Sequence, residues 1–217
     1  IRHVTDEGFV QVDPLGGFDA RVLRAQRVTI HTADGDLTGV IGSVPPHTLT
    51  DEQREADDDV ADVYIDLGRD AEAVTELVSV GDLVTLDQTL TELGDCVTGK
   101  ALDDRVCLFA MLEAARQIED PSVTIHFAAT VQEEVGLRGA HALGVDIDPD
   151  LAIALDVTVA NDVPQIGEPA DAVTEVGAGT AIKLKDSSVI TNPKVHRRLT
   201  AVATERDIPH QHEVLPA

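Results

Sequence analysis

The first ninety residues alternate apolar and polar positions in short runs, a pattern that predicts β-strands with one buried face. Glycine, proline and aspartate residues separate the runs, and the Asp34-Gly35 pair between two of them predicts a hairpin. Short strands at such spacing are typical of a small β-barrel or sandwich. The strands that this pattern predicts are residues 8–12, 27–31, 37–42, 62–67 and 82–88.

From about residue 100 the pattern becomes one of helices alternating with strands. Residues 105–118 carry apolar side chains at helical spacing, and a further helix is expected after the turn at Gly136 and Gly139. The Asn192-Pro193 pair combines an N-cap with proline at the first helical position, so it predicts a helix that ends near Arg206. The strands expected here are residues 122–131, 151–157 and 212–215, of which 151–157 is apolar enough for a buried parallel strand.

The change from one pattern to the other predicts two domains with a boundary near residue 90. Residues 1–90 form the β-rich domain, and residues 91–217 form an α/β domain. Alternation of strands and helices is typical of a mixed, mostly parallel sheet that is sandwiched by helices. The fold class that we predict is therefore α/β, with a small β-barrel added to it.

The chain of 217 residues carries a formal net charge of −24, from 40 acidic and 16 Lys or Arg residues. Such a charge disfavours binding to DNA, RNA or an anionic membrane, and no apolar run is long enough for a transmembrane helix. The acids are dispersed and Lys occurs at four positions only. We interpret this as adaptation to a salt-rich (halophilic) cytoplasm, where ions screen the repulsion, rather than as the composition of an ordinary acidic cytosolic protein.

Two cysteines, Cys96 and Cys107, stand eleven residues apart and match neither a disulfide framework nor a CxxC motif. We expect two buried, reduced thiols. A reducing compartment follows from that expectation, so the predicted location is the cytoplasm.

Four acids follow predicted strands or precede a predicted helix, where α/β enzymes place their chemistry. They are Asp103, Glu133, Glu134 and Asp156. Asp156 ends an apolar run, and an ionised group there needs a partner, which is either a cation or the backbone N–H groups of a loop. Adjacent acids such as Glu133 and Glu134 either decorate a helix N-terminus or divide metal binding and general-base catalysis between them.

Three segments decide between these alternatives, because in this order and at these intervals they resemble one family. They are residues 99–105 (GKALDDR), 129–140 (ATVQEEVGLRGA) and 154–160 (ALDVTVA). Together they resemble the tetrahedral (TET) aminopeptidases of the M42 metallopeptidase family. Residues 41–47 (IGSVPPH) resemble the dimerisation domain that is inserted in that family, so the resemblance covers essentially the whole chain.

The resemblance implies two divalent metal ions per subunit, zinc or cobalt with manganese also acceptable. Asp103 would bridge them, with Asp104 as the second candidate, while Glu134 and Asp156 would each bind one ion. Glu133 would be the general base. It also implies an aminopeptidase that releases N-terminal residues from oligopeptides, and dimers that assemble into a tetrahedral dodecamer.

Two metal-binding histidines of the family have no counterpart among the eight histidines of this chain, so we expect it to be part of a longer enzyme and inactive by itself. Two other functions remain open. One is a non-catalytic scaffold or shell subunit of the same fold, which the incomplete ligand set favours. The other is a glycoside hydrolase, which also uses paired carboxylates but usually no metal.

Overall fold

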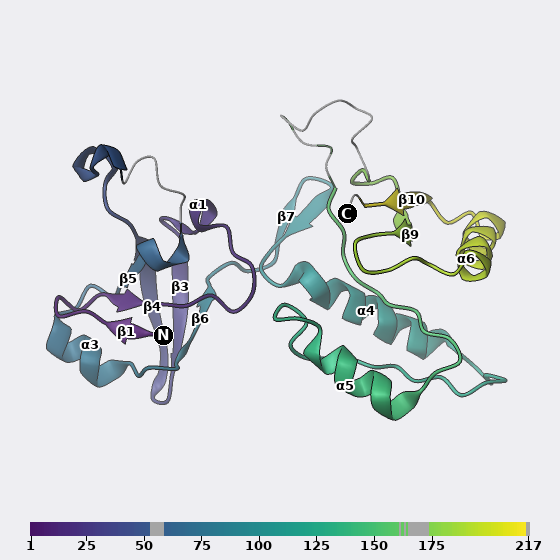
Figure 1. Cartoon of the computed structure of the whole chain (residues 1–217), viewed down its shortest axis with the longest axis horizontal. Helices are drawn as coiled ribbons and strands as arrows, with labels where there is room; N and C mark the ends of the chain where they lie inside the picture. Colours follow the sequence, from purple (N-terminus) through teal and green to yellow (C-terminus); the bar gives the residue numbers. More distant parts are fainter. Residues whose placement is uncertain (53–58, 161, 163, 165–173, 216–217) are drawn as a thin grey trace. The chain divides into compact units, whose positions relative to one another are not determined.

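The computed structural model describes residues 1–52, 59–160, 162, 164 and 174–215 (Figure 1). Contacts within the chain divide it into unit 1, Ile1–Ala154, and unit 2, Leu155–Ala217. Each unit is described by itself. The domain boundary near residue 90 stays a prediction.

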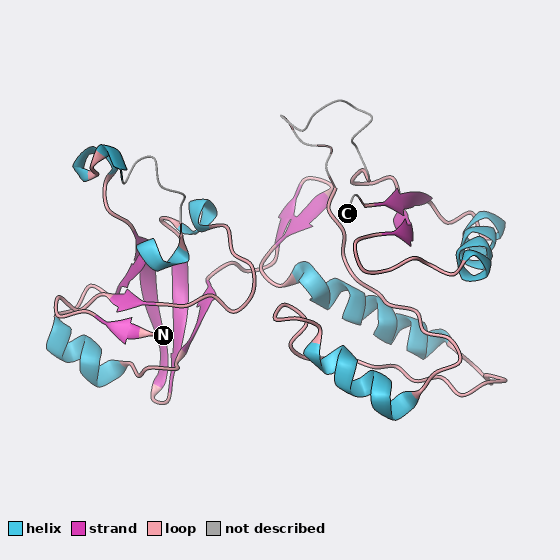
Figure 2. Ribbon diagram, in the orientation of Figure 1, coloured by secondary structure: helices cyan, strands magenta, loops and turns pink. Residues whose placement is uncertain are grey.

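A six-stranded antiparallel sheet dominates the first ninety residues, with the strand order β1-β2-β5-β4-β3-β6 (Figure 2). The predicted hairpin is confirmed: β3 and β4 pair from Thr32 opposite Gly35, and Gly35 has a φ of +128°, which favours glycine. The strands are β1 (His3–Val4), β2 (Val10–Gln11), β3 (Arg27–Thr32), β4 (Gly35–Gly42), β5 (Tyr64–Asp66) and β6 (Leu83–Leu86).

This sheet is curled but is not the closed barrel that the sequence pattern predicted. In a closed barrel the two edge strands would pair, whereas β1 and β6 share no strand pairing within the described residues. The curl still brings their ends together, because the Ile1 amino group donates to the Asp82 carbonyl over 2.6 Å and Gly81 N–H donates to the Ile1 carbonyl over 2.9 Å.

One apolar core stabilises this part of unit 1, because the alternating positions of the sheet face short helices. Ile30 and Ile65 from the sheet and Val74 from a helix have no exposed surface. The covering elements supply further core residues, Leu23 and Val60 among them. These elements are α1 (Ala20–Leu23), the 3₁₀ turn η2 (Val60–Asp62) and α3 (Ala71–Leu77), while η1 (Pro46–Thr48) follows β4.

Beyond the sheet, unit 1 contains a short hairpin and two helices, β7 (Thr91–Leu93), β8 (Cys96–Thr98), α4 (Leu102–Gln117) and α5 (Arg138–Ile147). The helices predicted here are confirmed, but neither α4 nor α5 has a buried residue.

Both cysteines are reduced as expected, whereas their predicted burial is wrong: Cys96 on the hairpin is exposed and Cys107 on α4 is half-buried. None of the described helices combines the length and apolarity that a membrane span requires.

The prediction of a mostly parallel sheet is wrong. Residues 122–131 and 151–157 form no strand, and Val131 and Leu151 are 71% and 60% exposed. A parallel strand needs hydrogen-bonded neighbours and helices over both faces, and the described part of the chain offers these segments no neighbouring strand. The pairing of β9 with β10 is parallel, and every other pair of described strands is antiparallel.

Unit 2 is built on that parallel pair, β9 (Thr180–Lys185) and β10 (His210–Val214), which α6 (Pro193–Glu205) joins. The predicted start of α6 is confirmed, since the Asn192 side chain accepts the Lys194 N–H over 2.9 Å and Pro193 occupies the first helical turn. Ile182 on β9 and Ala203 on α6 are buried, so the helix packs its apolar face on the strand pair.

Candidate active site

Asp103 and Asp104 lie at the start of α4, where the backbone is not helical. Both residues depart from helical φ and ψ, and the peptide bond between them is cis. Their carboxylates lie within 4.8 Å of each other. Asp104 Oδ1 is buried and has no hydrogen-bond partner among the described residues. A buried carboxylate oxygen without a donor is costly, and a divalent cation would satisfy it, so this part of the chain fits a metal.

A tight loop presents Glu133 and Glu134 just before α5. Gly139 N–H donates to the Val131 carbonyl over 3.0 Å, which closes the loop at its base. Gly136 has a φ of +110°, and its N–H and that of Leu137 donate to the Glu133 carbonyl over 3.0 and 2.9 Å. The sequence signal for this geometry is the pair of glycines, because the turn requires the left-handed region at the first and close backbone contact at the second.

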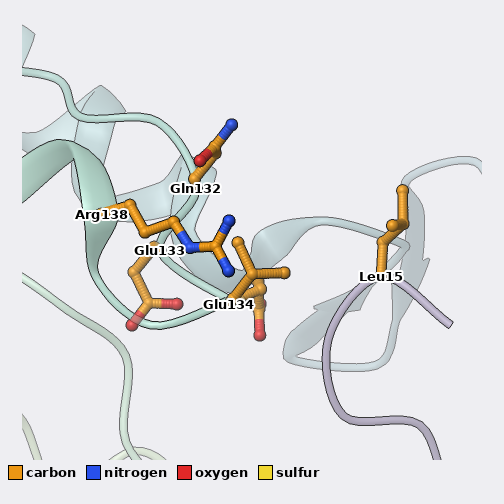
Figure 3. Close-up of a pocket in the computed structure, with 6 residues that line it drawn as sticks. Leu15, Gln132, Glu133, Glu134 and Arg138 are labelled. Carbon is orange, nitrogen blue, oxygen red and sulfur yellow. The ribbon is translucent and has the colours of Figure 1, made fainter.

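Glu133 and Glu134 are brought together in an open pocket of about 520 Å³ (Figure 3). Because α5 begins at Arg138 and has no acid in its first turn, interaction with the helix dipole does not explain the pair. The two carboxylates therefore lie in this pocket without serving as a cap of α5. The other residues that line it are Leu15, Gln132, Val135 and Arg138.

Asp156 belongs to unit 2, whereas the other three predicted site residues belong to unit 1. Its Oδ1 accepts the Val157 N–H over 2.8 Å, so part of the predicted backbone capping is present. Two residues further on, the Thr158 hydroxyl donates to Glu213, whose side chain is 1% exposed. The segment that carries Asp156 is thereby attached to β10 of its own unit.

Sequence reasoning missed this buried carboxylate and the ion network around it. Lys183 Nζ lies 3.3 Å from Glu213 Oε2 and 3.0 Å from Asp186 Oδ2. Burial opposes the charge on Lys183, but hydrogen bonds and attraction to Asp186 and Glu213 prevail and raise its pKa. The N–H of Ser188, the Lys183 ammonium and the N–H of Val189 hold the pKa of Asp186 well below its usual range. The available signal was Glu213 itself, a charged residue inside a predicted strand.

The family model for M42 glutamyl aminopeptidases matches residues 1–217, which is the whole chain. The chain belongs to the M42 peptidase family. It is 34% identical to the lysyl aminopeptidase of Pyrococcus furiosus over 100% of its own length and 62% of that relative.

Solved structures of M42-type aminopeptidases share the α/β fold. Aminopeptidase APDkam598 from Desulfurococcus kamchatkensis is 39% identical with a TM-score of 0.89, over 99% of this chain and 60% of that one. The TET1 peptidase of Pyrococcus horikoshii, whose structure is described as a tetrahedron or a large octahedral shell, is 32% identical with a TM-score of 0.81, over 100% and 65%.

The chain spans 61–63% of the length of three curated relatives. Activity, substrates and assembly are properties of proteins of that whole length, so for this chain they are matters of proposal.

Proposed function

We propose that this chain provides the carboxylate half of the active site of a metal-dependent aminopeptidase that releases N-terminal residues from oligopeptides. The observation that carries the proposal is the buried, unpaired Asp104 Oδ1 beside Asp103 in a chain of the M42 family. Asp103 would bridge two divalent ions, while Glu134 and Asp156 would each hold one of them. Zinc or cobalt fits a site of carboxylates and imidazoles, and manganese is acceptable.

Bound divalent ions would acidify water and polarise the scissile carbonyl. Glu133 is the general base that takes the proton from the attacking water and returns it to the leaving amine. Its place in an open pocket beside Glu134 supports this division, because the pocket is accessible to solvent and its acids are not in a helix cap. Arg138 in the same pocket would orient a carboxylate or carbonyl of the substrate.

We also propose a homo-oligomer, a tetrahedral dodecamer assembled from dimers, in which residues 1–90 provide the dimerisation domain. The support is the likeness to the TET1 peptidase of Pyrococcus horikoshii, which can assemble into a tetrahedron or a large octahedral shell. A cytoplasmic location is proposed on the two cysteines that form no disulfide.

The experiment compares two oligopeptides that differ only at the N-terminus, one with a free amine and one acetylated. The protein that carries this chain should release residues from the free peptide, lose that activity on chelation and regain it with cobalt or zinc. Equal cleavage of the acetylated peptide, or activity that survives removal of all metal, would contradict the proposal. Elemental analysis of the purified protein separates the enzyme from a metal-free scaffold.

A further inference from the structure

Three histidines gather on one face of unit 2, between α6 and β10. His210 and His212 are two residues apart on β10, so their side chains share a face of the strand pair. His196 projects from α6 onto that face: His212 Nδ1 lies 3.2 Å from His196 Nε2, and the two ring centroids are 5.0 Å apart. None of these residues belongs to the carboxylate site proposed above.

The separation of the two ring nitrogens matches that of two ligands on one ion. Imidazole nitrogens bound to a tetrahedral metal at 2.0–2.1 Å stand about 3.3 Å from each other. The neutral imidazole ring offers one lone pair, and the two nitrogens of this pair lie 3.2 Å apart, close enough to bind one ion together. A direct hydrogen bond between the rings gives a similar distance, and the experiment below distinguishes the two arrangements.

The local structure holds this pair in place before any ion arrives. His196 is fixed within α6, where its N–H donates to the Asn192 carbonyl over 3.0 Å and its carbonyl accepts the Thr200 hydroxyl over 3.0 Å. The His210 ring stands edge-on to the His212 ring at 5.9 Å, and its Nδ1 donates to the Ile208 carbonyl over 2.9 Å. His210 therefore limits the rotation of its neighbour and is a positioning residue.

The surroundings leave the pair accessible to solvent. His212 is exposed and His196 is half-buried. The nearest acid along the strand, Glu213, points to the opposite face, where it is 1% exposed and paired with Lys183. Imidazole ligands suit copper, zinc and nickel ions, with copper bound most tightly.

We propose that His196 and His212 form a two-imidazole site for a transition-metal ion of the copper, zinc and nickel class. Water molecules complete the coordination. The ion links α6 to β10, two elements that are joined in sequence only through residues 206–209, so binding stabilises unit 2 by an amount that rises with the logarithm of the free ion concentration above its Kd.

The test titrates Cu²⁺ into the purified chain and records electron paramagnetic resonance, which resolves couplings to imidazole nitrogen. The carboxylate site is disabled throughout by Asp103→Asn. Spectra with two imidazole nitrogens are expected. His196→Asn and His212→Asn should each weaken binding by at least the roughly tenfold that loss of an outer-shell partner already costs a metal site. His3→Asn, which removes an exposed imidazole from β1 in unit 1, is the matched control and should bind as before.

A second measurement uses chains whose histidines are all intact, so it does not depend on how a variant folds. Modification of imidazoles by diethyl pyrocarbonate, read by mass spectrometry, should be suppressed at His196 and His212 when Zn²⁺ is added and unchanged at His3. Equal modification with and without Zn²⁺, or copper affinity that neither substitution alters, would overturn the proposal and leave a plain hydrogen bond between the rings.

Discussion

Lys183 on β9 places its ammonium 3.3 Å from the carboxylate of Glu213 on β10, and Glu213 is 1% exposed. The same ammonium lies 3.0 Å from Asp186, while Thr158 donates its hydroxyl to Glu213. One buried acid thus joins both strands of unit 2 to the segment that follows Asp156. The stability of this unit and the placement of a predicted metal ligand therefore depend on the same network.

Replacing Lys183 with Met should destabilise unit 2, because it leaves the buried Glu213 carboxylate without its counter-charge. We expect a loss of about 3 kcal/mol, the lower end of what breaking a buried pair costs, since the Lys183 side chain keeps 31% of its surface exposed. Urea unfolding followed by hydrogen exchange of β9 and β10 measures it. Lys194→Met, at an exposed lysine of α6, is the control, and an equal loss in both variants would contradict the argument.

Asp186 should make the stability of unit 2 fall at acid pH. Its pKa is held below the usual value in the folded state, so its contribution is complete above the unfolded pKa of about 3.9 and is lost as pH falls through the lower folded value. Unfolding free energies measured from pH 6 to pH 2 should fall less steeply for Asp186→Asn than for the wild type. The exposed Glu76→Gln variant should keep the wild-type slope. A slope that Asp186→Asn leaves unchanged would refute the assignment.

The N-cap of α6 should be worth about 1 kcal/mol, the usual cost of replacing a capping Asn with Ala. Asn192→Ala removes the acceptor for the Lys194 N–H, whereas Asn192→Asp keeps one. Urea midpoints of the two variants provide the comparison. Equal stability of the Ala and Asp variants would show that the cap contributes nothing.

In the protein that carries this chain, Glu133→Gln should lower kcat by roughly 10²–10⁴-fold, the usual contribution of a general base, while the bound metal is retained. Glu134→Gln should instead lose metal, as elemental analysis would report. The control is Glu119→Gln, an exposed acid beyond the end of α4, which should leave both quantities unchanged. If Glu133→Gln is the variant that loses metal, the two roles are exchanged.

Salt should stabilise the protein, because its net charge of −24 is dispersed and repels itself at low ionic strength. At 1 M salt the screening length is about 3 Å, so most of this repulsion disappears. Thermal unfolding in rising KCl should give a rising Tm. A Tm that falls toward molar KCl would contradict the interpretation of the composition as halophilic.

Local signals in the sequence predicted local structure well. The Asp34-Gly35 turn and the Asn192 cap lie where the pattern placed them, because each depends on residues within one turn of chain. The predicted helix start at Arg105 also coincides with the point where α4 becomes regular, just after the two non-helical aspartates. Glu133 and Glu134, which their adjacency after a predicted strand singled out, line one pocket.

Features that depend on distant partners could not be predicted in this way. Residues 122–131 have the alternation of a strand, but alternation describes one face and does not supply a neighbour to pair with. The bond between Thr158 and Glu213 joins residues 55 positions apart, and the charge of Glu213 inside a predicted strand does not identify Thr158 as its partner. Asp156 combines the two cases. Its backbone cap depends on the next residue, whereas its proposed metal partners are distant in the sequence.

Gly139 constrains the loop that carries Glu133 and Glu134. A methyl group at this position would overlap the backbone of Val131, so the missing side chain sets how closely the first turn of α5 approaches the stretch ahead of Glu133. Glu133 and Glu134 lie in the chain between these two points of contact. A larger residue at position 139, which is outside the set that lines the pocket, should therefore displace Glu133 and Glu134 together.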